Sequence, residues 1–333
     1  MSWNSKPSTV NDLLNQSLHL PIRDFIDRQG KRIRGDLTEL SYKISGGRGH
    51  LSEEVCKSIE LLHAGSLVID DIQDCSSQRR GRATMHREIG MPQAMNAGNF
   101  MYFRALEVLA DSSLPTATRS RLTQEMIRAG RVCHEGQAID LAARLDGTQP
   151  QEWNAIASTI TARKTGTLVS LAMTMGSIAA GGSEYLAREL QRCGNQIGFA
   201  LQMRNDLAEL ATFAAGSTDR CDDLRNHRVT WPWAWLASQY SEQVCCELVK
   251  TLLQQDENKS LDGLRSLAVE IVDLVDSIGQ HEIERSIDEP LRLLGEHVVE
   301  PEFLAAVKRC LTPIRQSSQQ SNTVHAHPGK VTL

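Results

Sequence analysis

Apolar residues recur at helical spacing along almost the whole chain, and this pattern limits the fold more than any other feature. The clearest stretch, EEVCKSIELLHAGSLVIDDIQD at 53–74, follows Ser52, which with the glutamates after it predicts a helix start. The pattern also predicts helices at 91–112, 117–146, 151–180, 184–214, 230–255 and 262–311. Because no convincing run of strand-like alternation interrupts them, we expect an all-α protein whose long middle helices are interior.

Length and composition set further bounds. A chain of 333 residues can bury a large core, and no shift in composition marks a second domain. We therefore expect a single domain over 1–315, followed by a polar, disordered tail over 316–333. The net charge of -5 argues against a nucleic-acid partner, which needs a basic surface.

Two further features predict the cellular setting. The most apolar stretch, 168–182, is too short to span a bilayer, so the protein is not expected to be an integral membrane protein. The eight cysteines form no C-x-x-C pair, and the sequence shows no signal peptide. Reduced thiols in the cytoplasm are therefore expected.

Carboxylates gather at the end of the 53–74 helix, in IDDIQD. Asp70 and Asp74 are four residues apart and so project from one helix face, with Asp71 beside them. The preceding turn is apolar, and burying several carboxylates together is unfavourable unless cations neutralise them. This spacing favours a hard divalent cation such as Mg²⁺.

A second acidic cluster lies in GFALQMRNDLAEL at 198–210. Asn205 and Asp206 stand four and three residues before Glu209 on another apolar helix. Two such helices facing across a cavity would hold Mg²⁺, and thereby a diphosphate. Basic segments that suit phosphate oxygens also occur, at GKRIRG (30–35), RRGR (79–82), Lys164, Arg204 and RNHR (225–228).

These motifs together resemble the trans-type isoprenyl diphosphate synthases, the polyprenyl synthetase family, from about residue 28 to 240. QGKRIRG resembles the family's G-G-K-R-x-R-P, and LVIDDIQDCSSQRRG its first aspartate-rich motif with the two arginines after it. NAGNF, GQAIDL, RKTGTL, GFALQMRNDLAE and DDLRNHRVTWP follow in the family's order. The resemblance implies the isoprenoid synthase fold, a large helical bundle around a central apolar cavity.

The resemblance also implies a role for each charged group. Asp70 and Asp74, supported by Asp71, would bind Mg²⁺ ions that clamp an allylic prenyl diphosphate, and Arg79 would contact that diphosphate. Four side chains would form the pocket for isopentenyl diphosphate: Lys31, Arg34, His63 and Arg80.

Three further side chains would line the path of the reacting carbons: Lys164, Thr165 and Gln202. Lys164 would also reach the leaving diphosphate, and Gln137 and Asp140 would lie close to the metal cluster. Three Mg²⁺ ions with cationic side chains would stabilise the departing diphosphate, after which isopentenyl diphosphate attacks the allylic cation. A homodimer is implied on the same ground.

The sequence departs from the family pattern at the second metal motif. Asn205 replaces an aspartate there, and Glu209 replaces the last aspartate. The family's first lysine beyond the motif falls near Thr218, with Arg220 the nearest cation, and Arg228 stands where the second lysine would be. His227 replaces a glycine.

Several activities therefore stay open. We prefer chain elongation, because Lys31, Arg34 and His63 would have no use in a terpene cyclase. The alternatives are a class I terpene synthase, a prenyltransferase with another acceptor, and a weakly active subunit of a heteromeric synthase. Gly65 and Ser66 lie about one helical turn before Asp70, roughly 6 Å deeper. Because both are small, we expect a product of geranylgeranyl size or longer.

Overall fold

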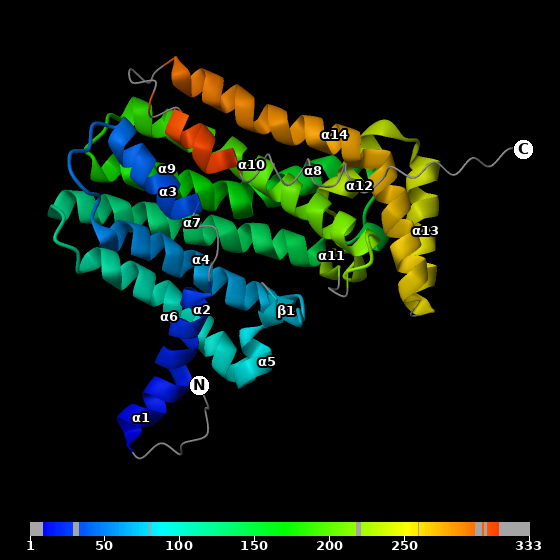
Figure 1. Ribbon diagram of the computed structural model, residues 1–333, viewed down its shortest axis with the longest axis horizontal. Coiled ribbons are helices and arrows are strands. Elements are labelled where there is room, and N and C mark those ends of the chain that lie inside the picture. Colours follow the sequence, from blue (N-terminus) through cyan, green and yellow to red (C-terminus); the bar gives the residue numbers. More distant parts are fainter. Residues whose placement is uncertain are drawn as a thin grey trace, which may run out of the picture. The chain divides into compact units, whose positions relative to one another are not determined.

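The computed structural model is built from helices, as the sequence predicts, with one short hairpin (Figure 1). It describes residues 9–28, 33–79, 81–217, 221–258, 260–296, 302 and 305–312. The chain divides into two compact units, here called unit 1 (Met1–Arg131 with Leu171–Arg188) and unit 2 (Val132–Ser170 with Glu189–Leu333). A single domain over 1–315 stays a prediction.

Unit 1 contains the N-terminal helices, the hairpin and the long helix that ends in the first acidic cluster. Its elements are α1 (Val10–Leu14), η1 (Asn15–His19), α2 (Leu20–Asp27), α3 (Ile33–Ile44), α4 (Glu53–Gln73), β1 (Gln78–Arg79), β2 (Arg82–Ala83), α5 (Met85–Ile89) and α6 (Met91–Ala110). It also includes parts of α7 (Thr116–Ala142), α9 (Thr167–Ala179) and α10 (Glu184–Ala214).

Helices α4 and α6 lie side by side in unit 1 (Figure 1). Two glycines permit the close approach: a Cβ on Gly65 would stand 2.9 Å from the Gly98 carbonyl oxygen, and one on Gly98 would stand 2.8 Å from an Ile69 side-chain carbon. Such distances leave no room for a methyl group. The facing glycines therefore fix the spacing between the two helices.

The hairpin follows directly after the first acidic cluster. Strands β1 and β2 are antiparallel, with Gln78 opposite Ala83 and Arg79 opposite Arg82. Gly81 in the turn has a φ of 74°, in the left-handed region that glycine adopts without steric cost. The sequence did not predict this hairpin, because two-residue strands are too short to show alternation.

Unit 2 carries the second acidic cluster and a core rich in tryptophan. Its remaining elements are η2 (Leu145–Gly147), α8 (Pro150–Thr161), η3 (Ala162–Gly166), α11 (Asp222–Arg225), α12 (Trp231–Gln239), α13 (Glu242–Glu257) and α14 (Leu261–Gly295). Trp231, Trp233 and Trp235 on α12 are all buried. Trp233 contacts Trp153 of α8 edge to face, with ring centroids 5.7 Å apart. The tryptophans are thus packing residues in the core.

The structure refines the predicted helix boundaries. The helix predicted at 151–180 contains a π-helical segment, η3, between α8 and α9. The helix predicted at 230–255 is two helices, because Ser241 starts α13 by accepting the backbone N–H of Val244. The helix predicted at 262–311 continues as α14 to Gly295, and 305–312 is also helical. The predicted tail at 316–333 lies outside the described residues.

None of the helices in the described part of the chain has both the length and the apolar character required to cross a bilayer.

Candidate active site

Asp71 and Arg79 form a tight ion pair at the end of α4. The Arg79 Nε donates to Asp71 Oδ1 at 2.7 Å and to Oδ2 at 2.9 Å, and its Nη2 lies 2.7 Å from Oδ1. Burial raises the pKa of Asp71, although the Arg79 guanidinium opposes that rise. Burial would lower the pKa of Arg79, but its bonds to Asp71 outweigh that effect and raise it. Asp71 thus orients Arg79, and its predicted support of Mg²⁺ binding stays a prediction.

Asp70 and Asp74 are placed differently from Asp71. The Asp70 side chain is 29% exposed and one of its oxygens lies 3.8 Å from Arg79 Nη2. Asp74 caps the helix, and its backbone N–H donates to the carbonyl oxygen of Asp70 at 2.9 Å. The two carboxylates therefore stand one turn apart at an end of the helix that solvent reaches.

These two carboxylates fit Mg²⁺, which takes one or two protein carboxylates and completes its octahedron with waters and phosphate oxygens. Among the described residues, no group of three or more His, Cys, Asp or Glu side chains is arranged to hold a metal ion by itself. The donor set suits an ion bound together with a diphosphate better than a cage built from protein ligands alone.

Arg34 and His63 meet in unit 1. Arg34 on α3 has its Nη1 3.0 Å from His63 Nε2 on α4. Because His63 precedes Asp70 by seven residues, the two share one face of α4, about 10 Å apart along the axis. Lys31 and Arg80, the other two residues predicted for the isopentenyl pocket, lie outside the described residues.

The structure adds a reason for the small residues before Asp70. Gly65 faces α6, where a Cβ would stand 3.1 Å from the ring of Tyr102 as well as close to the Gly98 carbonyl. The Ser66 hydroxyl donates to the carbonyl oxygen of His63 at 2.8 Å. Gly65 is therefore required for helix packing, and a role for either residue in product length stays a prediction.

In unit 2, Gln202 is held between two hydrogen-bonding partners. Thr165 Oγ1 donates to its Oε1 at 2.5 Å, and its Nε2 donates to Asp206 Oδ1 at 2.7 Å. Asp206 Oδ2 accepts the backbone N–H of Trp231 at 3.0 Å. Burial raises the pKa of Asp206 to about 7. Both oxygens of Asp206 therefore have protein donors, and the chain fixes the amide of Gln202.

Lys164 lies in the π-helical segment η3, next to Thr165. Its Nζ pairs with an Asp140 side-chain oxygen on α7, and the side chains of Lys164 and Asp140 are 25% and 21% exposed. Arg228 donates from Nη1 to the backbone carbonyl of Asp140. Gln137 precedes Asp140 by three residues on the same helix face. The structure thus brings the predicted Lys164, Asp140 and Arg228 together in unit 2.

The second metal motif is split between exposed and buried groups. Asn205 is exposed, and its Oδ1 accepts from Arg204 Nη2 at 2.9 Å. Burial raises the pKa of Glu209, while hydrogen bonds from the N–H groups of Asp223 and Asp222 and from the Cys221 thiol lower it. Glu209 thus bonds the start of α11, a contact that competes with its predicted metal role. Thr218 and Arg220 lie outside the described residues.

Sequence reasoning missed several contacts of this site. The indole Nε1 of Trp231 donates to Thr161 Oγ1 at 2.9 Å, across 70 positions, while its backbone N–H supports Asp206. The bond between the Arg228 side chain and the Asp140 carbonyl spans 88 positions. Such pairs depend on how helices pack, so no local pattern in the sequence indicates them.

Comparison with known proteins shows the family of the chain. A family model described as polyprenyl synthetase matches residues 15–267. The chain belongs to the polyprenyl synthetase family. A short chain isoprenyl diphosphate synthase of Methanothermobacter thermautotrophicus is 30% identical over 206 residues, 61% of this chain and 62% of that one. An octaprenyl diphosphate synthase of Haemophilus influenzae is 27% identical over 263 residues, 78% and 77% of the two chains.

A geranylgeranyl diphosphate synthase of Sulfolobus acidocaldarius is 31% identical over 219 residues, 62% of this chain. The match spans 65% of that relative's length, as it spans 62% of the Methanothermobacter protein. Among solved structures, a geranylgeranyl pyrophosphate synthetase from Pyrococcus horikoshii superposes with a TM-score of 0.70 at 23% identity, over 90% of each chain. This likeness shows that the chain has the all-α isoprenoid synthase fold.

Proposed function

We propose that the protein is a prenyltransferase that joins an allylic prenyl diphosphate to isopentenyl diphosphate in a Mg²⁺-dependent reaction. The product is geranylgeranyl diphosphate or a longer chain. The names of the relatives support this product range, because they include a geranylgeranyl and an octaprenyl diphosphate synthase.

One observation carries the choice of chain elongation. His63, Asp70 and Asp74 follow one another along one face of α4, and Arg34 is already in contact with His63. His63, with the Arg34 guanidinium of α3 donating to it, thus lies about 10 Å along the axis of α4 from a carboxylate pair. Such an arrangement suits two diphosphates, one bound directly by basic side chains and one bound through Mg²⁺. A cyclase, which binds one diphosphate, has no need of the Arg34–His63 pair.

The chain's own residues would share the chemistry as follows. Arg79, oriented by Asp71, binds the allylic diphosphate, and Arg34 with His63 holds isopentenyl diphosphate. Lys164 donates to the leaving diphosphate, and the fixed amide of Gln202 lines the path of the reacting carbons. The apolar helices exclude water from the carbocation.

Bound Mg²⁺ would neutralise the charge that develops on the departing diphosphate. Asp70 and Asp74 are the residues that fit it best, and three ions are proposed on the family resemblance. The same resemblance is the support for a homodimer and for a cytoplasmic location.

A second candidate is a class I terpene synthase, and one observation favours it. Asn205 is exposed and replaces a carboxylate with an amide, whereas Glu209 bonds the start of α11. The second motif therefore offers less negative charge to metal ions than two aspartates would.

One assay separates these functions. The purified protein is incubated with Mg²⁺, farnesyl diphosphate and isopentenyl diphosphate, and extracts are analysed before and after phosphatase treatment. Chain elongation predicts longer prenyl alcohols that appear only after phosphatase. A hydrocarbon formed without isopentenyl diphosphate would overturn elongation in favour of the cyclase. If neither forms, both proposals are wrong.

A further inference from the structure

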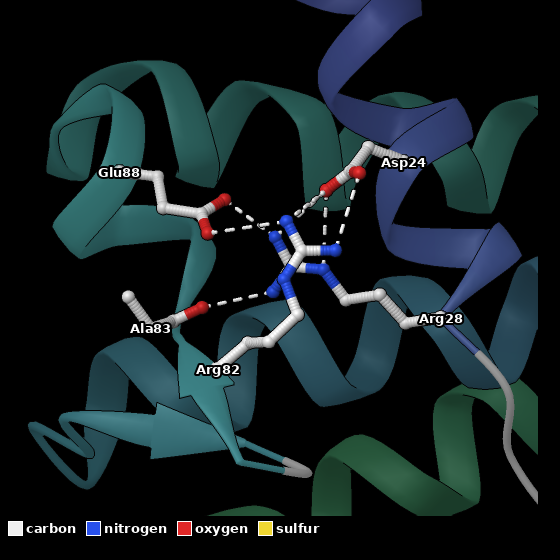
Figure 2. A network of polar contacts seen from close by, with 5 residues as sticks. All are labelled: Asp24, Arg28, Arg82, Ala83 and Glu88. Atoms are coloured by element: carbon white, nitrogen blue, oxygen red, sulfur yellow. Dashed lines mark hydrogen bonds and ion pairs between the residues drawn. The ribbon is translucent and has the colours of Figure 1, made fainter. Parts of the chain in front are cut away.

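Four charged side chains, none of them assigned to the site above, form a closed network in unit 1 (Figure 2). Arg28 is its centre, because its side chain is only 6% exposed. Its Nε and Nη2 donate to Asp24 Oδ2 at 3.2 and 2.9 Å, its Nη2 lies 2.5 Å from Glu88 Oε2, and its Nη1 donates to the Ala83 carbonyl at 2.8 Å. Arg82 closes the network by donating to both oxygens of Asp24, at 3.3 and 3.2 Å.

The network contains two cations and two carboxylates, so it has no net charge. Each of its four side chains contacts two of the others, and Arg28 also bonds a backbone carbonyl. It is therefore built to fix positions rather than to attract an anion. A planar guanidinium that donates several hydrogen bonds fixes the positions of its partners more tightly than a lysine, whose ammonium is a single charge on a flexible side chain.

The network joins two segments that are next in sequence to residues predicted for the isopentenyl pocket. Arg28 caps α2 and stands three residues before Lys31, the first basic residue predicted for the isopentenyl pocket. Ala83 and Arg82 form β2, whose partner strand ends at Arg79, directly before Arg80. The network thus ties the chain just before Lys31 to the strand just after Arg80.

Arg79 on β1, the residue proposed to contact the allylic diphosphate, is held by a separate ion pair. Arg79 is bonded through two nitrogens to Asp71, independently of Arg28. Loss of the network would leave that pair's own bonds in place and release the ties from α2 to β2 and α5. Of the two substrates, isopentenyl diphosphate is then the one whose binding should suffer.

We propose that Arg28 is a positioning residue for isopentenyl diphosphate, acting with Asp24, Arg82 and Glu88 to hold the end of α2 against β2 and α5. This inference rests on the proposed function. It adds to that function four residues that are not assigned to contact substrate, of which only Arg82 belongs to a basic segment noted in the sequence, RRGR at 79–82.

The test compares Arg28→Met with wild type in steady-state kinetics for each substrate. We expect KM for isopentenyl diphosphate to rise about tenfold, with KM for the allylic diphosphate and kcat changed by less than about twofold. The matched control is Arg104→Met, which removes an exposed ion pair between Arg104 and Glu107 on α6. It should leave all three constants unchanged.

A second variant separates positioning from stability. Arg28→Met leaves Glu88 with fewer partners, whereas the double variant Arg28→Met, Glu88→Met removes both and keeps the neutral Asp24–Arg82 pair. We expect the double variant to regain thermal stability lost by the single variant but to keep its high KM for isopentenyl diphosphate. Recovery of KM together with stability would overturn the positioning role.

Two other results would also overturn the inference, and they are distinguishable. If wild type turns over isopentenyl diphosphate and Arg28→Met has the same KM for it, the positioning role is wrong and the proposed function stands. If wild type gives no turnover and no calorimetric binding of isopentenyl diphosphate, the proposed function is wrong and the inference falls with it.

Discussion

Adjacent aspartates on α4 have different partners, and this difference decides what each substitution should do. Asp71 is 1% exposed and holds Arg79, whereas Asp70 is 29% exposed. We expect Asp71→Asn to lower the free energy of unfolding by about 2 kcal/mol, less than for a fully enclosed pair because Arg79 is itself 26% exposed. Chemical denaturation measures this change.

Asp70→Asn should show the opposite profile. Because Asp70 is proposed to bind Mg²⁺ and is partly exposed, its loss should lower kcat/KM by about 100-fold or more and change the free energy of unfolding by less than about 0.5 kcal/mol. Equal loss of stability in the two variants would contradict the different roles assigned to these neighbours.

The Arg28 network should also give the protein a specific response to acid. Burial would raise the pKa of Asp24, but its bonds to Arg28 and Arg82 outweigh that effect and lower it from 3.8. A carboxylate with a lowered pKa stabilises the folded state above its unfolded-state pKa, and this contribution is lost as pH falls through the folded pKa.

Asp24→Asn should therefore be less stable than wild type near pH 6, and the difference should shrink as pH falls below about 4. Urea unfolding at several pH values measures it. Glu107→Gln, on the exposed Arg104–Glu107 pair, serves as the control. A difference that stays constant from pH 6 to pH 3 would show that the Asp24 charge does not contribute.

At the scale of the elements, long amphipathic helices were predictable and short irregular ones were not. The start and end of α10 (Glu184–Ala214) agree with the predicted helix at 184–214, because sustained apolar periodicity defines them. The π-helical η3 carries Lys164 and Thr165 and has no sequence signature of its own. In the candidate site, the sequence predicted which residues share one face of a helix. It could not predict the bond between Gln202 and Thr165, which depends on how two helices pack.

The packing of α4 against α6 gives an element-scale prediction. Gly65→Ala would place a methyl group 2.9 Å from a backbone carbonyl that cannot move independently of α6. We expect it to destabilise the protein by about 1–3 kcal/mol. Gly130→Ala on α7 is the control, because a Cβ at this position would meet no described atom within 4 Å. We expect this variant to raise the free energy of unfolding by up to about 1 kcal/mol. Thermal melting of both variants decides whether space or helix propensity dominates.

At the scale of the whole molecule, the fold and the chemistry should depend on Mg²⁺ to different degrees. Each unit has its own apolar interior, exemplified by Ile59 and Met101 in unit 1 and by Trp153 and Trp233 in unit 2. Within the parts of the chain that the structure describes, His, Cys, Asp and Glu form no three-ligand metal group that could hold the fold together. Hydrophobic burial is thus the main source of stability.

Removal of Mg²⁺ with a chelator should consequently abolish prenyl transfer while the melting temperature changes by less than about 2 °C. Activity should return when Mg²⁺ is added back, because the carboxylates of Asp70 and Asp74 stay in place on an intact helix. Adding a non-hydrolysable prenyl diphosphate analogue with Mg²⁺ should raise the melting temperature, whereas neither component alone should do so strongly. A large fall in melting temperature on chelation alone would contradict this view, since it would mean that the ion is part of the fold rather than a partner of the substrate.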